Sequence, residues 1–167
     1  MVLQPLMHPL WTRVDSYLPQ LWRTVRAYEA NPALQDELMQ DVLLAIWQSL
    51  TRLRDPDRLL PFVLRIAHNL GASHVRDETR MPRGVSLDDA PHELAATPSS
   101  DAADAEGRWL LDALRRLPLP LRQVLLLQLE GFEYKQIADM LGISIDNVGV
   151  RAHRARKQLQ EIHDEHR

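Results

Sequence analysis

The chain contains no cysteine among its 167 residues, which excludes disulfides, thiolate metal sites and cysteine nucleophiles. Aromatic residues make up only 5% and glycines number six, a composition that argues against a β-rich fold. No apolar run reaches the roughly 18 residues of a membrane span. The first residues, MVLQPLMHPLW, hold two prolines and no basic segment, so neither a signal peptide nor membrane insertion is predicted. We therefore expect a cytoplasmic protein.

What the chain does contain favours helices. Hydrophobic residues make up 45%, and long stretches are rich in Leu, Ala, Arg, Glu and Gln. The sequence predicts an all-α fold of two small helical domains joined by a flexible acidic linker. The predicted parts are a first lobe at 8–79, a linker at 80–105, a second lobe at 106–162 and a tail at 163–167.

Each lobe has its own helical pattern. In the first lobe an amphipathic stretch over 10–31 is interrupted by Pro19, which predicts a kink or two shorter helices. The clearest helix covers 34–53, and a further helix begins at Leu59 or Pro61 and ends near Val75. Four helices are predicted in the second lobe: one at 108–117, one at 121–129 and two that form a helix-turn-helix.

Charge is distributed unevenly along the chain, although the net charge is only −3. The segment 84–106 has no Lys or Arg, and its acids are Asp88, Asp89, Glu93, Asp101, Asp104 and Glu106. By contrast, the segment 143–160 has four basic residues against the single acid Asp146. Such separation of charge is typical of a protein that contacts nucleic acid at one place only.

The helix-turn-helix is the most informative local pattern. Gly142 permits a tight turn, Ser144 is a good N-cap, and Asp146 suits the positive first turn of the helix that follows. In that last helix the spacing of the apolar residues predicts a buried stripe of Val148, Ala152, Ala155 and Leu159. One step around the helix lie Asn147, Arg151, Arg154 and Gln158. Amides and guanidinium groups on an exposed helix are the side chains that bind base edges and phosphates in a major groove.

Three segments in the same order resemble the extracytoplasmic-function (ECF) group of bacterial RNA polymerase sigma factors. They are DELMQDVLLAIW (36–47), FVLRIAHNLGASHVR (62–76) and LRRLPLPLRQVLLLQLEGFEYKQIADMLGISIDNVGVRAHRARKQL (114–159). The resemblance spans nearly the whole chain. It implies an alternative sigma factor rather than an enzyme, with region 2 in the first lobe and region 4 in the second. It also implies core RNA polymerase and promoter DNA as partners, and no cofactor or metal.

The resemblance assigns polymerase docking to the clearest helix. The residues that match the surface docking on the clamp helices of the largest subunits are Asp36, Glu37, Gln40 and Asp41. An exposed stripe of carboxylates and amides on a rigid helix suits an arginine-rich partner. The second lobe of such factors meets the polymerase flap, and the acidic linker suits the positively lined RNA-exit channel. Some members are held inactive by an anti-sigma factor, which no residue here identifies.

Recognition of the −10 element is implied for the end of the first lobe. Its matching residues are Asn69, Ser73, His74 and Arg76, whose polar side chains suit a flipped base. Family members usually carry a basic run after this helix, and here Asp77 and Glu78 interrupt it. His68 and His74 are not at a metal-ligand spacing on one face, so surface or stacking positions are expected for both.

Recognition of the −35 element is implied for the last helix. The matching residues and their neighbours are Asn147, Arg151, Arg154, Arg156 and Lys157. We expect Arg151 to approach base edges, and the other three basic residues to hold phosphates and so fix the register. Gly149 stands where family members often have Lys, which leaves the base preference open.

Two alternatives remain at this point. A free helix-turn-helix regulator that binds operator DNA is one, although such a protein is expected to be basic or dimeric, and this chain is acidic without a heptad seam. The other is a metal-dependent hydrolase that uses the C-terminal acids and histidines. Its candidate ligands are Asp88, Asp89, Glu161, His163, Asp164, Glu165 and His166. That tail is terminal and polar, and nothing nearby supplies a positioned base.

Overall fold

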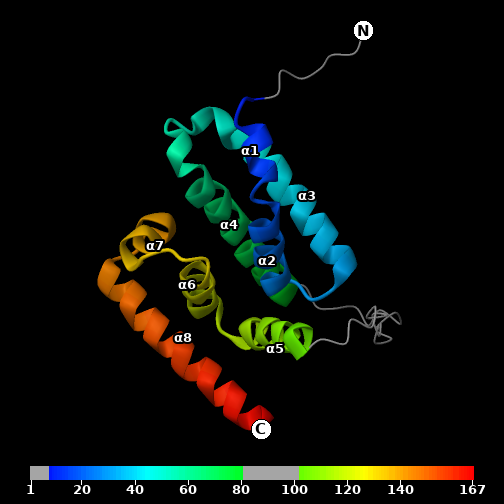
Figure 1. Ribbon diagram of the computed structural model, residues 1–167, viewed down its shortest axis with the longest axis vertical. Helices are drawn as coiled ribbons and strands as arrows, with labels where there is room; N and C mark the ends of the chain where they lie inside the picture. The colour runs from blue at the N-terminus through cyan, green and yellow to red at the C-terminus, as the bar shows by residue number, and fades with distance from the viewer. Residues whose placement is uncertain (1–7, 81–101) are drawn as a thin grey trace.

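The computed structural model describes residues 8–80 and 102–167, and every regular element in that part of the chain is a helix (Figure 1). The all-α prediction is therefore confirmed. The first lobe contains α1 (Trp11–Asp15), α2 (Leu18–Tyr28), α3 (Pro32–Ser49), two short 3₁₀ turns (Leu50–Arg52 and Pro56–Arg58) and α4 (Leu59–Arg80). The second contains α5 (Ala102–Arg116), α6 (Leu119–Leu129), α7 (Tyr134–Leu141) and α8 (Ile145–His166). The linker residues 81–101, with four of the six predicted acids, lie outside the described residues.

The first lobe is a bundle in which α2, α3 and α4 pack on one another. Pro19 lies in the first turn of α2, so the proline separates two helices, as one of the two expectations for it had stated. Asn31 caps α3, since its side chain accepts a hydrogen bond from the backbone N–H of Ala33 at 3.0 Å. The apolar faces of the three helices meet in a core that includes Leu21, Val25, Val42, Ile46, Val63 and Leu64.

His68 lies in this core, so of the surface and stacking positions expected for it the surface position was wrong, and its ring instead meets that of Tyr28 edge to face. Its side chain has no exposed area, and its Nδ1 lies 2.7 Å from the Tyr28 hydroxyl. Burial lowers the pKa of His68 to about 3 and raises the pKa of Tyr28, so both groups are neutral at pH 7. The sequence could not show this because the partner hydroxyl comes from a different helix.

The second lobe contains the predicted helix-turn-helix, α7 and α8. Gly142 adopts φ +67° at the C-cap of α7, the left-handed conformation that the turn needs. Ser144 caps α8, accepting a hydrogen bond from the backbone N–H of Asn147 at 3.1 Å. At the other end of α7, Glu133 and Gln136 form a capping box. Helix α5 begins at Ala102, earlier than the predicted 108, because the Ala-rich residues before Arg108 continue the helix.

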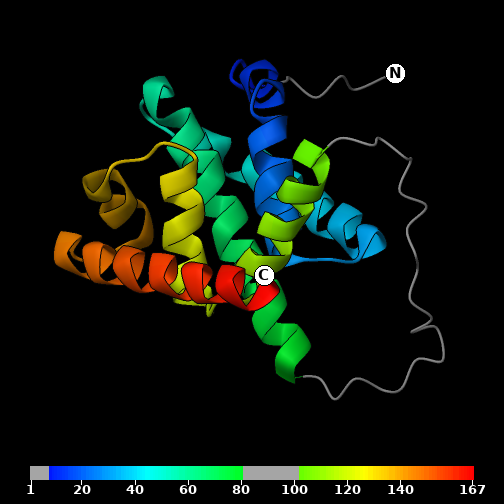
Figure 2. The ribbon, with the colours of Figure 1, turned by 60° about the horizontal axis from the view of Figure 1, so that its bottom comes forward.

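The two lobes pack together, with α5 beside α2 and α7 against α4 (Figure 2). Two arginines of the second lobe bind the free carbonyls at the C-terminal end of α2. The Nε–H of Arg115 donates to the carbonyl of Arg26 at 2.8 Å, and Arg122 donates to the carbonyl of Ala27 at 3.3 Å. These carbonyls have no partner within α2, and cations are favourable at this end of a helix.

A second contact between the lobes is a bidentate ion pair. Arg23 of α2 donates from Nε and Nη2 to the two carboxylate oxygens of Glu130, at 2.8 and 2.9 Å.

Across residues 8–80 and 102–167, none of the helices combines the length and the apolar character needed to cross a bilayer.

Candidate nucleic-acid interface and docking surface

The four predicted docking residues lie side by side on α3. Asp36, Glu37, Gln40 and Asp41 are all exposed, while Leu38, Val42 and Ile46 on the other side of the helix are buried. Helix α3 lies on the side of the first lobe away from α6, α7 and α8 (Figure 1). The structure thus gathers the acids and the amide into one accessible surface on a rigid helix, and the second lobe does not cover it.

Leu44 extends this surface and was missed by the sequence reasoning. Its side chain is 55% exposed, although leucines are usually buried, and it follows Gln40 and Asp41 by about one helical turn. The signal that could have found it is positional. Leu38, Val42 and Ile46 already fill the buried stripe, and Leu44, two residues after Val42, lies on the opposite side of the helix.

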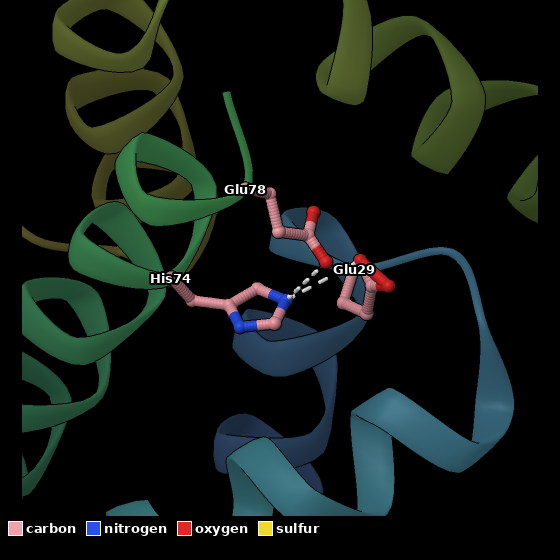
Figure 3. A group of neighbouring side chains, drawn as sticks. All are labelled: Glu29, His74 and Glu78. Carbon is pink, nitrogen blue, oxygen red and sulfur yellow. Dashed lines mark ion pairs between the residues drawn. The ribbon is translucent and has the colours of Figure 1, made fainter. Parts of the chain in front are cut away.

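The four residues assigned to the −10 element are at the C-terminal half of α4, but they do not form one open surface. Asn69 and Arg76 are exposed. Ser73 is half-buried, and its hydroxyl accepts a hydrogen bond from Arg76 Nη2 at 3.4 Å. The side chain of His74 is 21% exposed and turns toward Glu29 and Glu78 (Figure 3). Two of the four side chains are therefore presented freely to solvent.

On α8 the buried stripe is as predicted: Val148, Ala152 and Ala155 have no exposed area, and Leu159 is partly buried. Asn147, Arg154, Arg156 and Lys157 are exposed, whereas Arg151 is half-buried. Arg156 donates to the Tyr134 hydroxyl at 3.2 Å, so α7 holds its guanidinium in place. The structure therefore separates half-buried Arg151, near the edge of the buried stripe, from the three exposed cations Arg154, Arg156 and Lys157.

An apolar part of the α8 surface was also missed. Ile145 and Val150 are 49% and 47% exposed. Together with Tyr134, Gly149 and His153 they line a shallow hollow beside Arg154. Apolar side chains at a recognition helix contact the methyl group of thymine, whereas arginines bind guanine edges. Val150 could have been found from the sequence, because it does not fall on the stripe of Val148, Ala152 and Ala155. Ile145, three residues before Val148, is in line with that stripe, so periodicity did not indicate its exposure.

The C-terminal acids and histidines do not assemble into a metal or catalytic centre in the described residues. His163 is half-buried with its ring 5.1 Å from that of Trp109, and Glu165 pairs with Arg116 at 3.2 Å. Glu161, Asp164 and His166 are exposed. Asp88 and Asp89 lie outside the described residues. Within the described ranges, the His and acid side chains that come close enough to share an ion are Glu29, His74 and Glu78, from another part of the molecule.

Comparison with protein families gives two matches. Residues 13–81 match the model for sigma-70 region 2, and residues 107–159 match the model for sigma-70 region 4. Among curated proteins, the chain is 30% identical to the RNA polymerase sigma factor CarQ of Myxococcus xanthus, over 90% of this chain and 82% of that protein. It is 32% identical to the probable RNA polymerase sigma factor RfaY of Xanthomonas campestris, over 80% of this chain but 35% of that longer protein.

A third relative is the ECF RNA polymerase sigma factor SigE of Mycolicibacterium smegmatis, with 26% identity over 95% of this chain and 63% of that protein. Two solved structures have the same fold. CnrH, in complex with the cytosolic domain of CnrY, superposes with a TM-score of 0.66 at 24% identity over 92% of this chain and 86% of that one. RpoE of Bartonella quintana, in complex with the anti-sigma factor NepR, superposes with a TM-score of 0.68 at 23% identity, over 93% of this chain and 97% of that one.

Proposed function

The chain belongs to the sigma-70 family of RNA polymerase sigma factors, in its ECF group, and we propose how its surfaces divide the work of promoter-specific initiation. Its first lobe, residues 8–79, docks on core polymerase and engages the −10 element. The second lobe, residues 106–162, reads the −35 element. One observation carries this: an exposed acidic stripe on α3 and an exposed cationic face on α8 lie on two helical lobes of one chain.

Docking is assigned to the stripe of Asp36, Glu37, Gln40 and Asp41 on α3, extended by Leu44. The carboxylates suit the arginine-rich clamp helices of the largest subunits, and charge-assisted hydrogen bonds give such contacts their direction. Leu44, which is 55% exposed, would supply an apolar contact at the end of this stripe and would be covered on assembly. The flap of the polymerase is the partner proposed for the second lobe.

Contact with the −10 element is assigned to Asn69, Ser73, His74 and Arg76. Asn69 and Arg76 are exposed and available to a base edge and a phosphate. Ser73 and His74 are partly covered, so they would engage DNA only after a local change in their side-chain contacts.

Contact with the −35 element is assigned to Asn147, Arg151, Arg154, Arg156 and Lys157, with base contacts from Arg151 and phosphate contacts from the other basic residues. The half-buried position of Arg151 is compatible with one guanidinium edge reaching a base near the start of the helix. Ile145 and Val150, beside this set, would recognise thymine methyl groups.

Four further points complete the proposal. The chain would act without a catalytic centre or cofactor of its own, since the polymerase supplies the chemistry, and it would act in the cytoplasm, where promoter DNA is transcribed. Its acidic linker would follow the positively lined RNA-exit channel of the polymerase. An anti-sigma factor is a further proposed partner, because the solved relatives CnrH and RpoE are bound to CnrY and to an anti-sigma factor.

The deciding experiment is assembly with core RNA polymerase followed by run-off transcription from a promoter library. We expect wild-type protein to co-purify with the core enzyme and to select promoters with −10 and −35 elements. The variant with Gln40→Ala and Asp41→Lys should lose assembly while its helical content by circular dichroism stays unchanged.

The matched control is Asp15→Lys, which makes the same charge change at another exposed acid of the first lobe, at the end of α1. It should assemble like wild type. A free protein that binds promoter duplex tightly and specifically at physiological salt, and that does not join the core enzyme, would instead establish the free regulator.

A further inference from the structure

We propose that Glu29, His74 and Glu78 form a binding site for a divalent transition-metal ion, with zinc as the ion that suits their chemistry best. Glu29 is the C-cap residue of α2, and the other two lie one turn apart on α4. Figure 3 shows the imidazole of His74 directed at both carboxylates. The site lies in the first lobe and does not depend on the function proposed above. It shares His74 with the surface assigned to the −10 element, and a bound ion would hold that imidazole against Glu29 and Glu78 instead of DNA.

The distances in this cluster match a shared ion. The Nε2 atom of His74 lies 3.2 Å from Oε1 of Glu78 and 3.5 Å from Oε2 of Glu29. One ligand atom from each residue lies within 4.8 Å of the others. Tetrahedral zinc with bonds of about 2.1 Å places its ligand atoms about 3.4 Å apart. Both distances from the histidine nitrogen are close to that value.

Ordinary hydrogen bonds do not account for the arrangement. A charge-assisted N–H···O bond is usually about 2.7–2.9 Å long. His74 Nε2 is buried and has no hydrogen-bond partner in the described part of the chain, although two carboxylates surround it. A single N–H could satisfy only one of the two acids. An ion at the centre would be coordinated by all three groups at once.

Glu29 provides a second, independent indication. Its side chain is only 10% exposed, and within residues 8–80 and 102–167 its carboxylate makes no hydrogen bond or ion pair other than the long one to His74. The nearby Arg115 binds the backbone carbonyl of Glu29 and not the carboxylate. Burying a carboxylate without a hydrogen bond is costly unless a cation is paired with it. Two carboxylates, a neutral imidazole and a divalent ion together carry no net charge.

The fold brings these residues together through a close approach of α2 and α4. Gly71 lies one turn before His74, and a Cβ at that position would stand 2.5 Å from Cδ2 of Tyr28. The absence of this Cβ lets the helices come near enough for Glu29 to reach the His74–Glu78 face. A bound ion would therefore fasten the end of α2 to the end of α4.

The ligand types select the metal class. One imidazole and two carboxylates suit zinc and its neighbours among the first-row metals, while magnesium and calcium prefer all-oxygen sites with more ligands. Three protein ligands leave one position of a tetrahedral ion for water. The chain has no cysteine to compete for the ion.

The test is calorimetric titration of the full, chelator-treated chain with zinc chloride. We expect one equivalent to bind, and the melting temperature to rise with excess zinc but not with magnesium. Glu29→Gln and His74→Gln should each weaken binding about tenfold or more, because each removes a ligand. The matched control is the double variant His163→Gln with His166→Gln, which removes two histidines at the end of α8 and should bind zinc like wild type.

Helical content must stay unchanged in the variants, and one measurement avoids variants altogether. In wild-type protein labelled with ¹⁵N, zinc should shift the Nε2 resonance of His74 more than that of any other histidine. Absence of saturable zinc binding would overturn the proposal. Binding that survives Glu29→Gln would overturn it too, since Glu29 would then not be a ligand. Binding that disappears in the His163 and His166 double variant would place the ion at the end of α8 and would overturn it as well.

Discussion

The guanidinium carbon of Arg122 lies 5.6 Å from the centre of the Tyr28 ring, and this contact joins the two lobes. Arg122 is 6% exposed, and besides Ala27 it binds the carbonyls of Arg115 and Leu117 at 2.7 and 2.9 Å. One side chain thus caps the end of α2, closes the turn between α5 and α6, and covers an aromatic ring. A buried arginine is favourable only where carbonyls and an aromatic face replace its water.

The contact predicts how the lobes separate. Arg122→Met removes the donors and leaves three carbonyls without them, so we expect a loss of about 2–3 kcal/mol in the free energy of unfolding and a wider separation of the lobes. Because the chain has no native cysteine, dyes can be attached through Gln48→Cys on α3 and Lys135→Cys on α7, both exposed positions. Energy transfer between the dyes should fall in the Arg122→Met variant.

Arg116→Met is the control for this measurement. Arg116 is 57% exposed, and it forms an ion pair with Glu165 inside the second lobe. The Arg116→Met variant should therefore change neither the free energy of unfolding nor the energy transfer by much. Equal energy transfer in wild type and in Arg122→Met would mean that the remaining contacts, including Arg23 with Glu130, hold the lobes together without Arg122.

A second prediction concerns two glycines within helices. Gly71→Ala adds a methyl group 2.5–2.6 Å from ring atoms of Tyr28. We therefore expect the free energy of unfolding to fall by about 1–3 kcal/mol, despite the better helix propensity of alanine. Gly107→Ala meets no atom within 4 Å and should stabilise the chain by about 0.5–1 kcal/mol. Urea unfolding of both variants decides this, and a stabilising Gly71→Ala would contradict the packing described for α2 and α4.

The third prediction is a dependence of stability on pH. The pKa of His68 is about 3 in the folded chain and near 6.5 when unfolded, so between these values the unfolded state binds an extra proton. The contribution of His68 to the free energy of unfolding is present in full above about pH 6.5. It is lost as the pH falls below that value, by about 1.4 kcal/mol per pH unit. From pH 6.5 to 5.0 the wild type should lose about 2 kcal/mol more than His68→Gln. Parallel pH profiles would contradict the buried, neutral state of His68.

The fourth prediction addresses Gly149. A Cβ there would stand 3.7 Å from Cε2 of Tyr134, an ordinary contact, so α8 accepts a side chain at this position. Gly149→Ala should raise stability by about 0.5–1 kcal/mol. Gly149→Lys should in addition tighten promoter binding and steepen its salt dependence by about one charge. Binding measured at several salt concentrations, with Gly149→Ala as the control, separates the added charge from the added helix stability.

The fifth prediction separates reading from positioning on α8. Arg151→Ala should lose discrimination at one or two −35 positions, by about 1–3 kcal/mol, whereas Lys157→Ala should weaken all promoters alike. Transcription from promoter variants measures both. If Val150→Ala changes base preference while Arg151→Ala weakens every promoter equally, the reading face is the one centred on Val150, which is exposed, and not the one on half-buried Arg151.

The sequence by itself determined the helices, the turn and the family. Pro19, Asn31, Gly142 and Ser144 act within a few residues of their own positions, so their effects on helix ends can be read locally. Likewise the exposed acids of α3 and the buried stripe of α8 follow from helical periodicity, which places residues three and four apart on one face.

Only the tertiary structure decided which side chains from different helices meet. The burial of His68 depends on the hydroxyl of Tyr28, and the capping of α2 depends on arginines of the other lobe. The direction of the His74 side chain depends on Glu29. Periodicity gives the direction of a side chain relative to its own helix but carries no information on the neighbouring helix. The packing of α2, α4 and α5 supplies that information, because close contact, burial and the loss of water together fix the charge state and partners of each group.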